Sequence, residues 1–136
     1  MGAWAIDALG NDDACDWVYG LDKCNDLALV EETLNKALKE GAAYLESPDA
    51  CEALAAIEVI ARLQGNWGEK NSYSESMDAW VEKTELAPSQ ELAEKAHKVI
   101  ARILADDSEL RELWQESEEF DEWKASVKNL ADRVHV

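Results

Sequence analysis

The sequence has few of the residues that make turns and few positive charges. Only six of its 136 residues are glycine and two are proline. This scarcity disfavours a β-sandwich or barrel, because those folds need a turn after every short strand. Lysine and arginine number 13 against 30 aspartates and glutamates, so the formal net charge is −17. Such a charge repels phosphate backbones and anionic lipids. We therefore expect no direct binding to nucleic acid or to a membrane surface.

Cysteine, histidine and long apolar runs are also scarce. The cysteines Cys15, Cys24 and Cys51 are odd in number and form no C-x-x-C pair, which excludes an evident disulfide framework or zinc knuckle. Two histidines are too few for a histidine-rich metal site. No run reaches the roughly 18 apolar residues of a membrane span, and the first residues lack the features of a signal peptide. These absences predict a cytoplasmic protein without a metal or cofactor.

The apolar residues that are present recur with helical spacing. They make up 47% of the sequence, which is enough to bury a core. They fall at intervals of three and four residues, and no segment shows the strict alternation of a β-strand. The pattern predicts one all-α domain over residues 1–136, an irregular bundle of six to seven short helices.

Polar caps and prolines indicate where each helix begins. Acidic, amide and hydroxyl side chains at these points accept hydrogen bonds from the first free backbone N–H groups of a helix. The predicted starts are Asn11 to Asp13, Asn25 with Asp26, Ser47 before Pro48, Ser74, Ser89 after Pro88, Asp106 to Ser108, and Ser117 or Glu118. Gly41 and Gly65 are predicted to end the second and third helices.

The third helix, at about residues 48–64, is apolar on nearly every side. A helix of this kind is buried, so we expect it to be the central helix of the bundle. Glu58 and Arg62 lie four residues apart on it. They form either a salt bridge along its least buried edge or a buried polar pair. A buried pair is costly unless it is well hydrogen-bonded, and it can indicate function.

Two patterns partly resemble the residue spacing of metal-binding sites. Glu94 and His97 have the Glu-x-x-His spacing of di-iron bundles, but only one proper copy exists, since Asp132 and His135 are a poor substitute. Four carboxylates lie within ten residues, but they lack the spacing and glycine of an EF-hand, and helix capping explains three of them. These four are Asp7, Asp12, Asp13 and Asp16. No nucleophile–base motif or phosphate-binding loop is present, so we expect no catalytic site.

Tryptophan is the one abundant aromatic residue, with six copies. Trp4 and Trp67 lie in irregular segments, where an exposed indole would anchor a partner protein. The alternative for Trp4 is that it holds the N-terminal segment against the bundle. The other four lie on apolar stripes and are predicted to be in the core: Trp17, Trp80, Trp114 and Trp123.

Several segments resemble one family across nearly the whole chain. M-G-A-W at residues 1–4 and N-D-D-A-C-D-W-V at 11–18 are similar to the opening of a bacterial family known as domain of unknown function 4259. Residues 55–61 and 108–114 are similar to its other blocks. Ala5 and Leu9 depart from it, where the family often has glycine and an aromatic residue. The resemblance implies a bacterial, cytosolic, helical protein and supplies no catalytic residue. It groups Trp4, Asp12, Asp13, Asp16 and Trp17 as a candidate site or folding nucleus.

The function favoured by the sequence is a non-enzymatic, acidic protein-interaction domain. An inhibitor or immunity protein that neutralises a basic partner would fit the small size and the charge. The charge is spread evenly, with 14 acidic and 5 basic residues over 1–70 and 16 and 8 over 71–136. The candidate partner-binding residues are Trp4, Asp12, Asp13, Asp16 and Trp67.

Three alternatives remain open. The first is a protein of the same family that has no toxin partner. The second is a nucleic-acid mimic, whose carboxylates would have to line up as an exposed stripe. The third and weakest is a carboxylate–metal enzyme that uses Glu58, Glu94 and His97. The sequence gives no indication of the oligomeric state.

Overall fold

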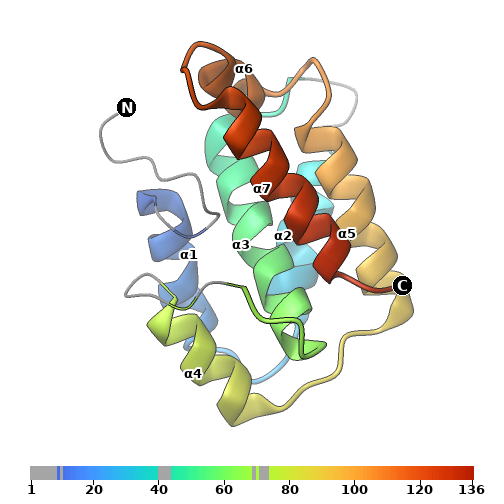
Figure 1. The fold of residues 1–136 in the computed structure, drawn as a ribbon. Coiled ribbons are helices and arrows are strands. Elements are labelled where there is room, and N and C mark those ends of the chain that lie inside the picture. Colours follow the sequence, from blue (N-terminus) through green and yellow to red (C-terminus); the bar gives the residue numbers. More distant parts are fainter. Residues whose placement is uncertain (1–8, 10, 40–43, 69, 71–73) are drawn as a thin grey trace.

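The computed structural model describes residues 9, 11–39, 44–68, 70 and 74–136 (Figure 1). Trp4, Asp7 and the predicted helix end at Gly41 lie outside these residues. The described part of the chain contains seven helices and no strand, which confirms the predicted all-α bundle. The helices are α1 (Asp12–Leu21), α2 (Ala28–Lys39), α3 (Ser47–Leu63), α4 (Glu75–Thr84), α5 (Gln90–Ile103), α6 (Glu109–Gln115) and α7 (Phe120–Arg133).

Most helices begin at their predicted caps. The Asn11 side chain accepts a hydrogen bond from the backbone N–H of Ala14 at 2.8 Å. Asp26, Ser89 and Ser108 accept equivalent bonds at the starts of α2, α5 and α6. Two starts differ by a few residues. Helix α3 begins at Ser47 itself, with Glu46 as its N-cap. Helix α7 begins only at Phe120, because the preceding residues form a turn in which the Ser117 hydroxyl accepts from the N–H of Glu119.

Helix α3 lies at the centre of the bundle and contacts every other helix (Figure 1). From Ala50 to Arg62, every residue except Glu52 is buried. Alanines supply much of this surface, and their small side chains let neighbouring backbones approach closely. The predicted central helix is therefore confirmed, and its position determines where all the other helices pack.

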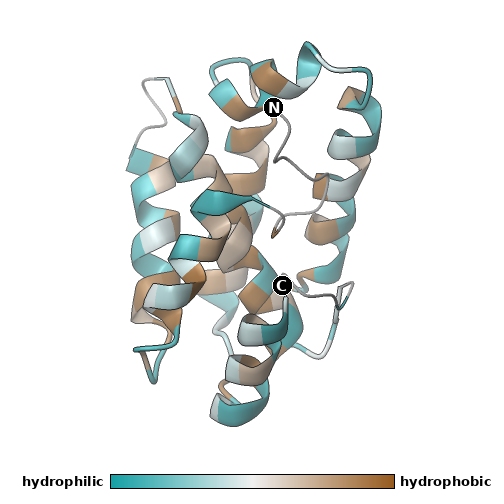
Figure 2. Cartoon of the chain, turned by 90° about the vertical axis from the view of Figure 1, so that its left-hand side faces the viewer, coloured by the Kyte–Doolittle hydropathy of each residue, from teal (hydrophilic) through white to brown (hydrophobic). Residues whose placement is uncertain are grey.

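The outer helices are amphipathic, with apolar stripes that face α3 (Figure 2). The four tryptophans predicted for the core are buried. The Trp17 indole N–H donates to the Thr33 hydroxyl at 2.8 Å, and the Trp80 indole N–H donates to the Cys24 carbonyl at 2.9 Å. Trp114 and Trp123 stack with ring centroids 6.2 Å apart. Each buried indole N–H that donates in this way avoids the cost of an unmade hydrogen bond.

The two ends of α3 are covered in different ways. At its N-terminal end, Leu45 pairs with the segment before α6 through hydrogen bonds to Asp107 and Glu109. At its C-terminal end, Gly65 has φ +87°. The N–H groups of Gly65 and Asn66 donate to Arg62 and Ala61, the pattern in which a left-handed glycine closes a helix. The chain then reverses direction toward α4. No helix in the described residues is long and apolar enough to cross a membrane.

The tight packing around α3 predicts a strong response to added volume. Ala56 is fully buried, so Ala56→Leu is expected to lower the free energy of unfolding by about 1–3 kcal/mol through overpacking. Ala101→Leu makes the same change at an exposed position of α5 and should shift it by less than about 0.5 kcal/mol. Chemical denaturation measures both. Equal stabilities for the two variants would contradict the central position of α3.

Candidate functional site

Glu58 and Arg62 are both buried on α3, with 7% and 2% of their surfaces exposed. The Arg62 Nη1 group donates to Glu58 Oε1 within the helix. The pair does not lie on an exposed edge of α3. Both charges sit inside the bundle, where removal from water is costly unless partners compensate.

Those partners come from two further helices. Arg62 Nε donates to Asp78 Oδ1 on α4 at 2.7 Å. On the other side, Arg133 at the end of α7 donates to both oxygens of Glu58, from Nη2 at 2.8 Å and from Nη1 at 3.1 Å. Asp78, Arg62, Glu58 and Arg133 thus alternate in sign, and we call them the charge chain. It carries no net charge and connects α4, α3 and α7.

The remaining polar atoms around the charge chain are also hydrogen-bonded. The Ser74 hydroxyl donates to Asp78 Oδ2 at 2.8 Å, and Arg133 Nε donates to Asn129 Oδ1 at 3.1 Å. Every carboxylate oxygen of Glu58 and Asp78 therefore accepts at least one bond. Such saturation is what a buried ion pair requires. It gives the charge chain a structural role, because these carboxylates find their hydrogen-bond partners within the fold.

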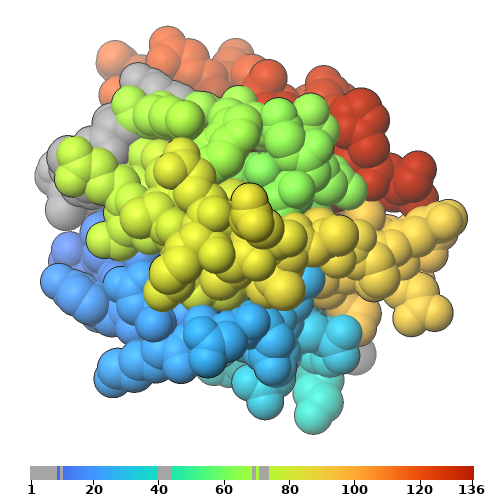
Figure 3. Space-filling model, turned by 90° about the horizontal axis from the view of Figure 1, so that it is seen from below, coloured from blue at the N-terminus to red at the C-terminus, as the bar shows by residue number. Residues whose placement is uncertain are grey.

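Gly68 is part of the same arrangement. A Cβ atom at this position would lie 2.7 Å from Arg133 Nη1 and 3.1 Å from Arg133 Cζ. A side chain at this position would displace the Arg133 guanidinium from its present place, whereas glycine lets the backbone after α3 pass close to it. Figure 3 shows this turn, coloured green, beside the red C-terminal end of α7.

The opposite end of α3 gathers acidic residues. The N-termini of α3, α6 and α7 lie together there (Figure 1). Residues 106–122 contain nine acidic residues, and Arg111 is their one basic residue. The net charge is divided evenly between the two halves of the sequence, so those counts do not show this local concentration of acidic residues. Many of these carboxylates lie in first helical turns, where the helix dipole favours negative charge.

Tyr44 lies among these acids with 44% of its surface exposed. Its hydroxyl donates to Glu112 Oε1. That hydrogen bond, followed by desolvation and the charges of Glu112, Glu109 and Glu46, raises the pKa of Tyr44 to about 12. Glu109 also accepts from the Ser47 N–H at 2.7 Å, which fixes it beside the start of α3. We call Tyr44 with Glu46, Glu109 and Glu112 the acidic end.

One α1 carboxylate, Asp13, lies near the same part of α3. Burial raises the pKa of Asp13, and Asp16 and Asp12 raise it further. Burial also raises the pKa of the Cys51 thiol to about 12, with further contributions from Asp13, Glu52 and Glu109. Burial, Asp49 and Asp13 likewise raise the pKa of Glu52, while Lys36 opposes them. Negative charges are therefore crowded around the start of α3.

The candidate partner-binding residues that the structure describes come from two separate segments, α1 and the turn after α3. Asp12 and Asp16 are exposed on α1, and Asp13 beside them is partly buried toward α3. Trp67 follows the opposite end of α3, is half-buried against the core, and has Lys70 Nζ 4.3 Å from its ring centroid. Trp4 lies outside the described residues.

The patterns considered for metal chemistry form no ligand cluster in the part of the chain that the structure describes. Glu94 is exposed, whereas His97 Nε2 contacts the Val134 carbonyl at 2.8 Å. No group of three or more potential ligands (His, Cys, Asp or Glu) in the described residues could hold a metal ion.

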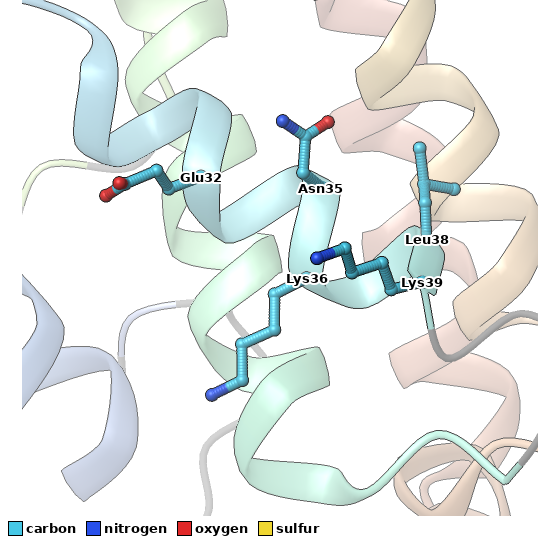
Figure 4. A pocket seen from close by; sticks show the side chains of 5 residues that line it. All are labelled: Glu32, Asn35, Lys36, Leu38 and Lys39. Carbon is cyan, nitrogen blue, oxygen red and sulfur yellow. The ribbon is translucent and has the colours of Figure 1, made fainter.

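A surface hollow lies on α2. Its described lining comes from this one helix and has mixed charge (Figure 4). The lining residues are Glu32, Asn35, Lys36, Leu38 and Lys39.

These features define a class of protein, an acidic helical bundle built on a central helix. Ion pairs neutralise the buried charges at one end of this helix, and carboxylates crowd around its other end. A family model described as "Domain of unknown function (DUF4259)" matches residues 2–126. The chain therefore belongs to that family, as its N-terminal motif indicated. No curated protein and no solved structure matches it.

Sequence reasoning found Glu58 and Arg62 but missed their partners. Asp78 directly follows the buried Met77 on α4, and Arg133 directly precedes the buried Val134. In the sequence, each of these partners is a charged residue next to an apolar stripe. Many surface residues have the same position, so the pattern does not single out these two. The position of Gly68 against Arg133 and the role of Tyr44 both depend on contacts between distant parts of the sequence, 68 residues apart for Tyr44 and Glu112.

The crowding of carboxylates predicts how stability depends on pH. The pKa of Glu52 is raised in the folded state, so the folded protein holds this proton more tightly than the unfolded chain. Ionised Glu52 therefore destabilises the fold at pH 7, and this cost disappears as the pH falls below its ordinary pKa of 4.5. Glu52→Gln is expected to raise the melting temperature at pH 7 and to lose that advantage below about pH 4.5.

Thermal unfolding followed by circular dichroism at several pH values measures this effect. Glu94→Gln, at an exposed position of α5, is the matched control and should change the melting temperature less. A Glu52→Gln variant that is less stable than the wild type at pH 7 would contradict the crowding of charge at this end of α3.

Proposed function

We propose that this chain is a non-enzymatic, acidic protein-interaction domain that neutralises a basic protein partner, as an inhibitor or immunity protein does. The observation that carries the proposal is the acidic end, where Glu46, Glu109 and Glu112 surround the half-exposed Tyr44. Tyrosine is enriched among residues that dominate binding energy, because it offers apolar area together with a polar tip.

Electrostatics support the same proposal. The charge chain neutralises itself inside the fold, whereas the carboxylates around the start of α3 repel one another. A basic partner would relieve that repulsion on binding. It would also be drawn in by the long-range field of the chain, which raises association rates at low ionic strength.

The distribution of charge favours this function over a nucleic-acid mimic. A mimic needs carboxylates spaced along a stripe in place of phosphates. Here three helix N-termini gather them at one end of the bundle instead. Glu109 is hydrogen-bonded to the first residue of α3 and Glu112 to Tyr44 just before it, and these fixed positions suit a local contact with a folded partner.

The test is affinity capture from the native source with an isosteric variant. Glu46→Gln/Glu109→Gln/Glu112→Gln removes three charges and keeps side chains that still accept hydrogen bonds. The wild type should capture a basic protein in a salt-dependent manner, and this variant should capture at least about tenfold less, since loss of a few charge contacts costs more than about 1.4 kcal/mol.

The control removes the same number of charges elsewhere. Glu75→Gln/Glu82→Gln/Glu94→Gln changes exposed positions on α4 and α5 and should capture the partner as the wild type does. If both triple variants lose the partner equally, net charge alone is responsible and the acidic end is not the contact surface. Capture of general chaperones only would contradict the proposed function itself.

A further inference from the structure

The segment that follows α7 is held by side chains that contact its backbone. At the end of α7 the backbone becomes extended, with φ −95° and ψ 113° at Val134. The Arg133 carbonyl accepts from the Asn66 side chain at 2.8 Å, and the Val134 carbonyl contacts His97 Nε2 at 2.8 Å. The Gln64 amide forms two bonds with His135, accepting from its N–H at 2.8 Å and donating to its carbonyl at 2.7 Å.

Two side chains of the same segment are also recognised. The Arg133 guanidinium is received by Glu58, by the Asn66 carbonyl and by the open face of Gly68. Val134 is buried with only 3% of its surface exposed. The neighbouring His135 and Val136 are exposed. Glu58, Gln64, Asn66, Gly68 and His97 therefore form what we call the tail groove.

The composition of the tail groove is that of a peptide-recognition site. Its members come from the end of α3, the turn after it, and α5. They contact an arginine side chain, the apolar side chain that follows it, and the backbone of the next residue. The side-chain amides bind backbone groups of the extended segment and do not need the helix that precedes it. They can therefore bind an extended segment of another protein in the same way.

We propose that residues 133–135 are an intramolecular ligand of the tail groove, and that an extended segment of another protein with arginine followed by a small branched apolar residue competes for it. The contact is autoinhibitory, because the groove is available only when its own occupant leaves. The proposal does not depend on the proposed function, since the acidic end lies at the other end of α3.

The geometry makes departure of the segment a local event. The Val134 N–H donates to the Ala131 carbonyl. After this bond, the segment makes no helical hydrogen bond that its departure would break. The buried Val134 side chain, the ion pair of Arg133 with the buried Glu58, and side-chain hydrogen bonds to its backbone hold it. Opening by fraying of the last turn of α7 therefore costs less than global unfolding.

The test uses the full chain and a fluorescent peptide, Arg-Val-His-Val. The variant Arg133→Ala/Val134→Ser weakens the resident segment and leaves every groove residue intact. Fluorescence anisotropy should show saturable peptide binding to this variant. Binding to the wild type should be at least about tenfold weaker, because the resident segment leaves only a small fraction of molecules competent. Circular dichroism confirms that the variant is folded.

Two controls separate recognition from charge attraction. The peptide Val-His-Val-Arg has the same composition and charge and should not compete. Gln64→Ala, added to the double variant, should weaken binding of Arg-Val-His-Val. Equal binding of both peptides, or no saturable binding to the folded double variant, would overturn the proposal. A dimer formed by exchange of α7 between two copies would assign the groove to a second copy and would overturn it as well.

If the double variant fails to fold, hydrogen exchange of the wild type decides. The His135 amide, which donates to Gln64, should exchange through local opening, much faster than amides in the middle of α7. Added Arg-Val-His-Val should accelerate its exchange, while Val-His-Val-Arg should not. Exchange of the His135 amide only at the rate of global unfolding would overturn the proposal.

Discussion

The fold depends on two charges that are buried among apolar residues in the central helix. Glu58 and Arg62 lie within α3, the helix that every other helix contacts. Apolar surfaces tolerate small shifts between helices, but a buried ion pair does not, because an unpaired charge inside the bundle costs several kcal/mol. Asp78 must therefore lie beside Arg62 and Arg133 beside Glu58. Gly68, which has no side chain, leaves room for the Arg133 guanidinium. The charge chain thus determines how α4 and α7 sit against α3.

The same helix has opposite electrostatic character at its two ends. At the C-terminal end, two cations and two anions cancel within the bundle. At the N-terminal end, first-turn acids of α3 and α6 meet the carboxylates of α1 with few cations among them. The net charge of −17 is therefore not spread evenly over the structure, although it is even along the sequence. This asymmetry separates the two proposals in space, with a basic partner at the acidic end and an arginine-containing segment at the tail groove.

Local signals in the sequence predicted the helices but not the contacts between them. Asn11, Asp26, Ser89 and Ser108 cap helices as their positions indicated, because a cap is decided within four residues. The buried character of α3 followed from its composition. The partners of Glu58 and Arg62 could not be predicted, since Arg133 lies 75 residues from Glu58 and Asp78 lies 16 residues from Arg62. The predicted start of α7, at Ser117 or Glu118, was too early, because the Ser117 side chain caps a turn before the helix begins.

The most direct test of the charge chain is a double-mutant cycle between Glu58 and Arg133, using Glu58→Gln and Arg133→Gln with chemical denaturation. We expect a coupling energy of at least about 1.5 kcal/mol, as measured for close, desolvated charge pairs. The pair of Lys36 and Asp49, 3.1 Å apart with the lysine mostly exposed, provides the reference and should give about 0.2–1 kcal/mol. Additive effects at Glu58 and Arg133, within about 0.5 kcal/mol, would show that the two residues act independently. That result would contradict the claim that buried ion pairs position α7 on the central helix.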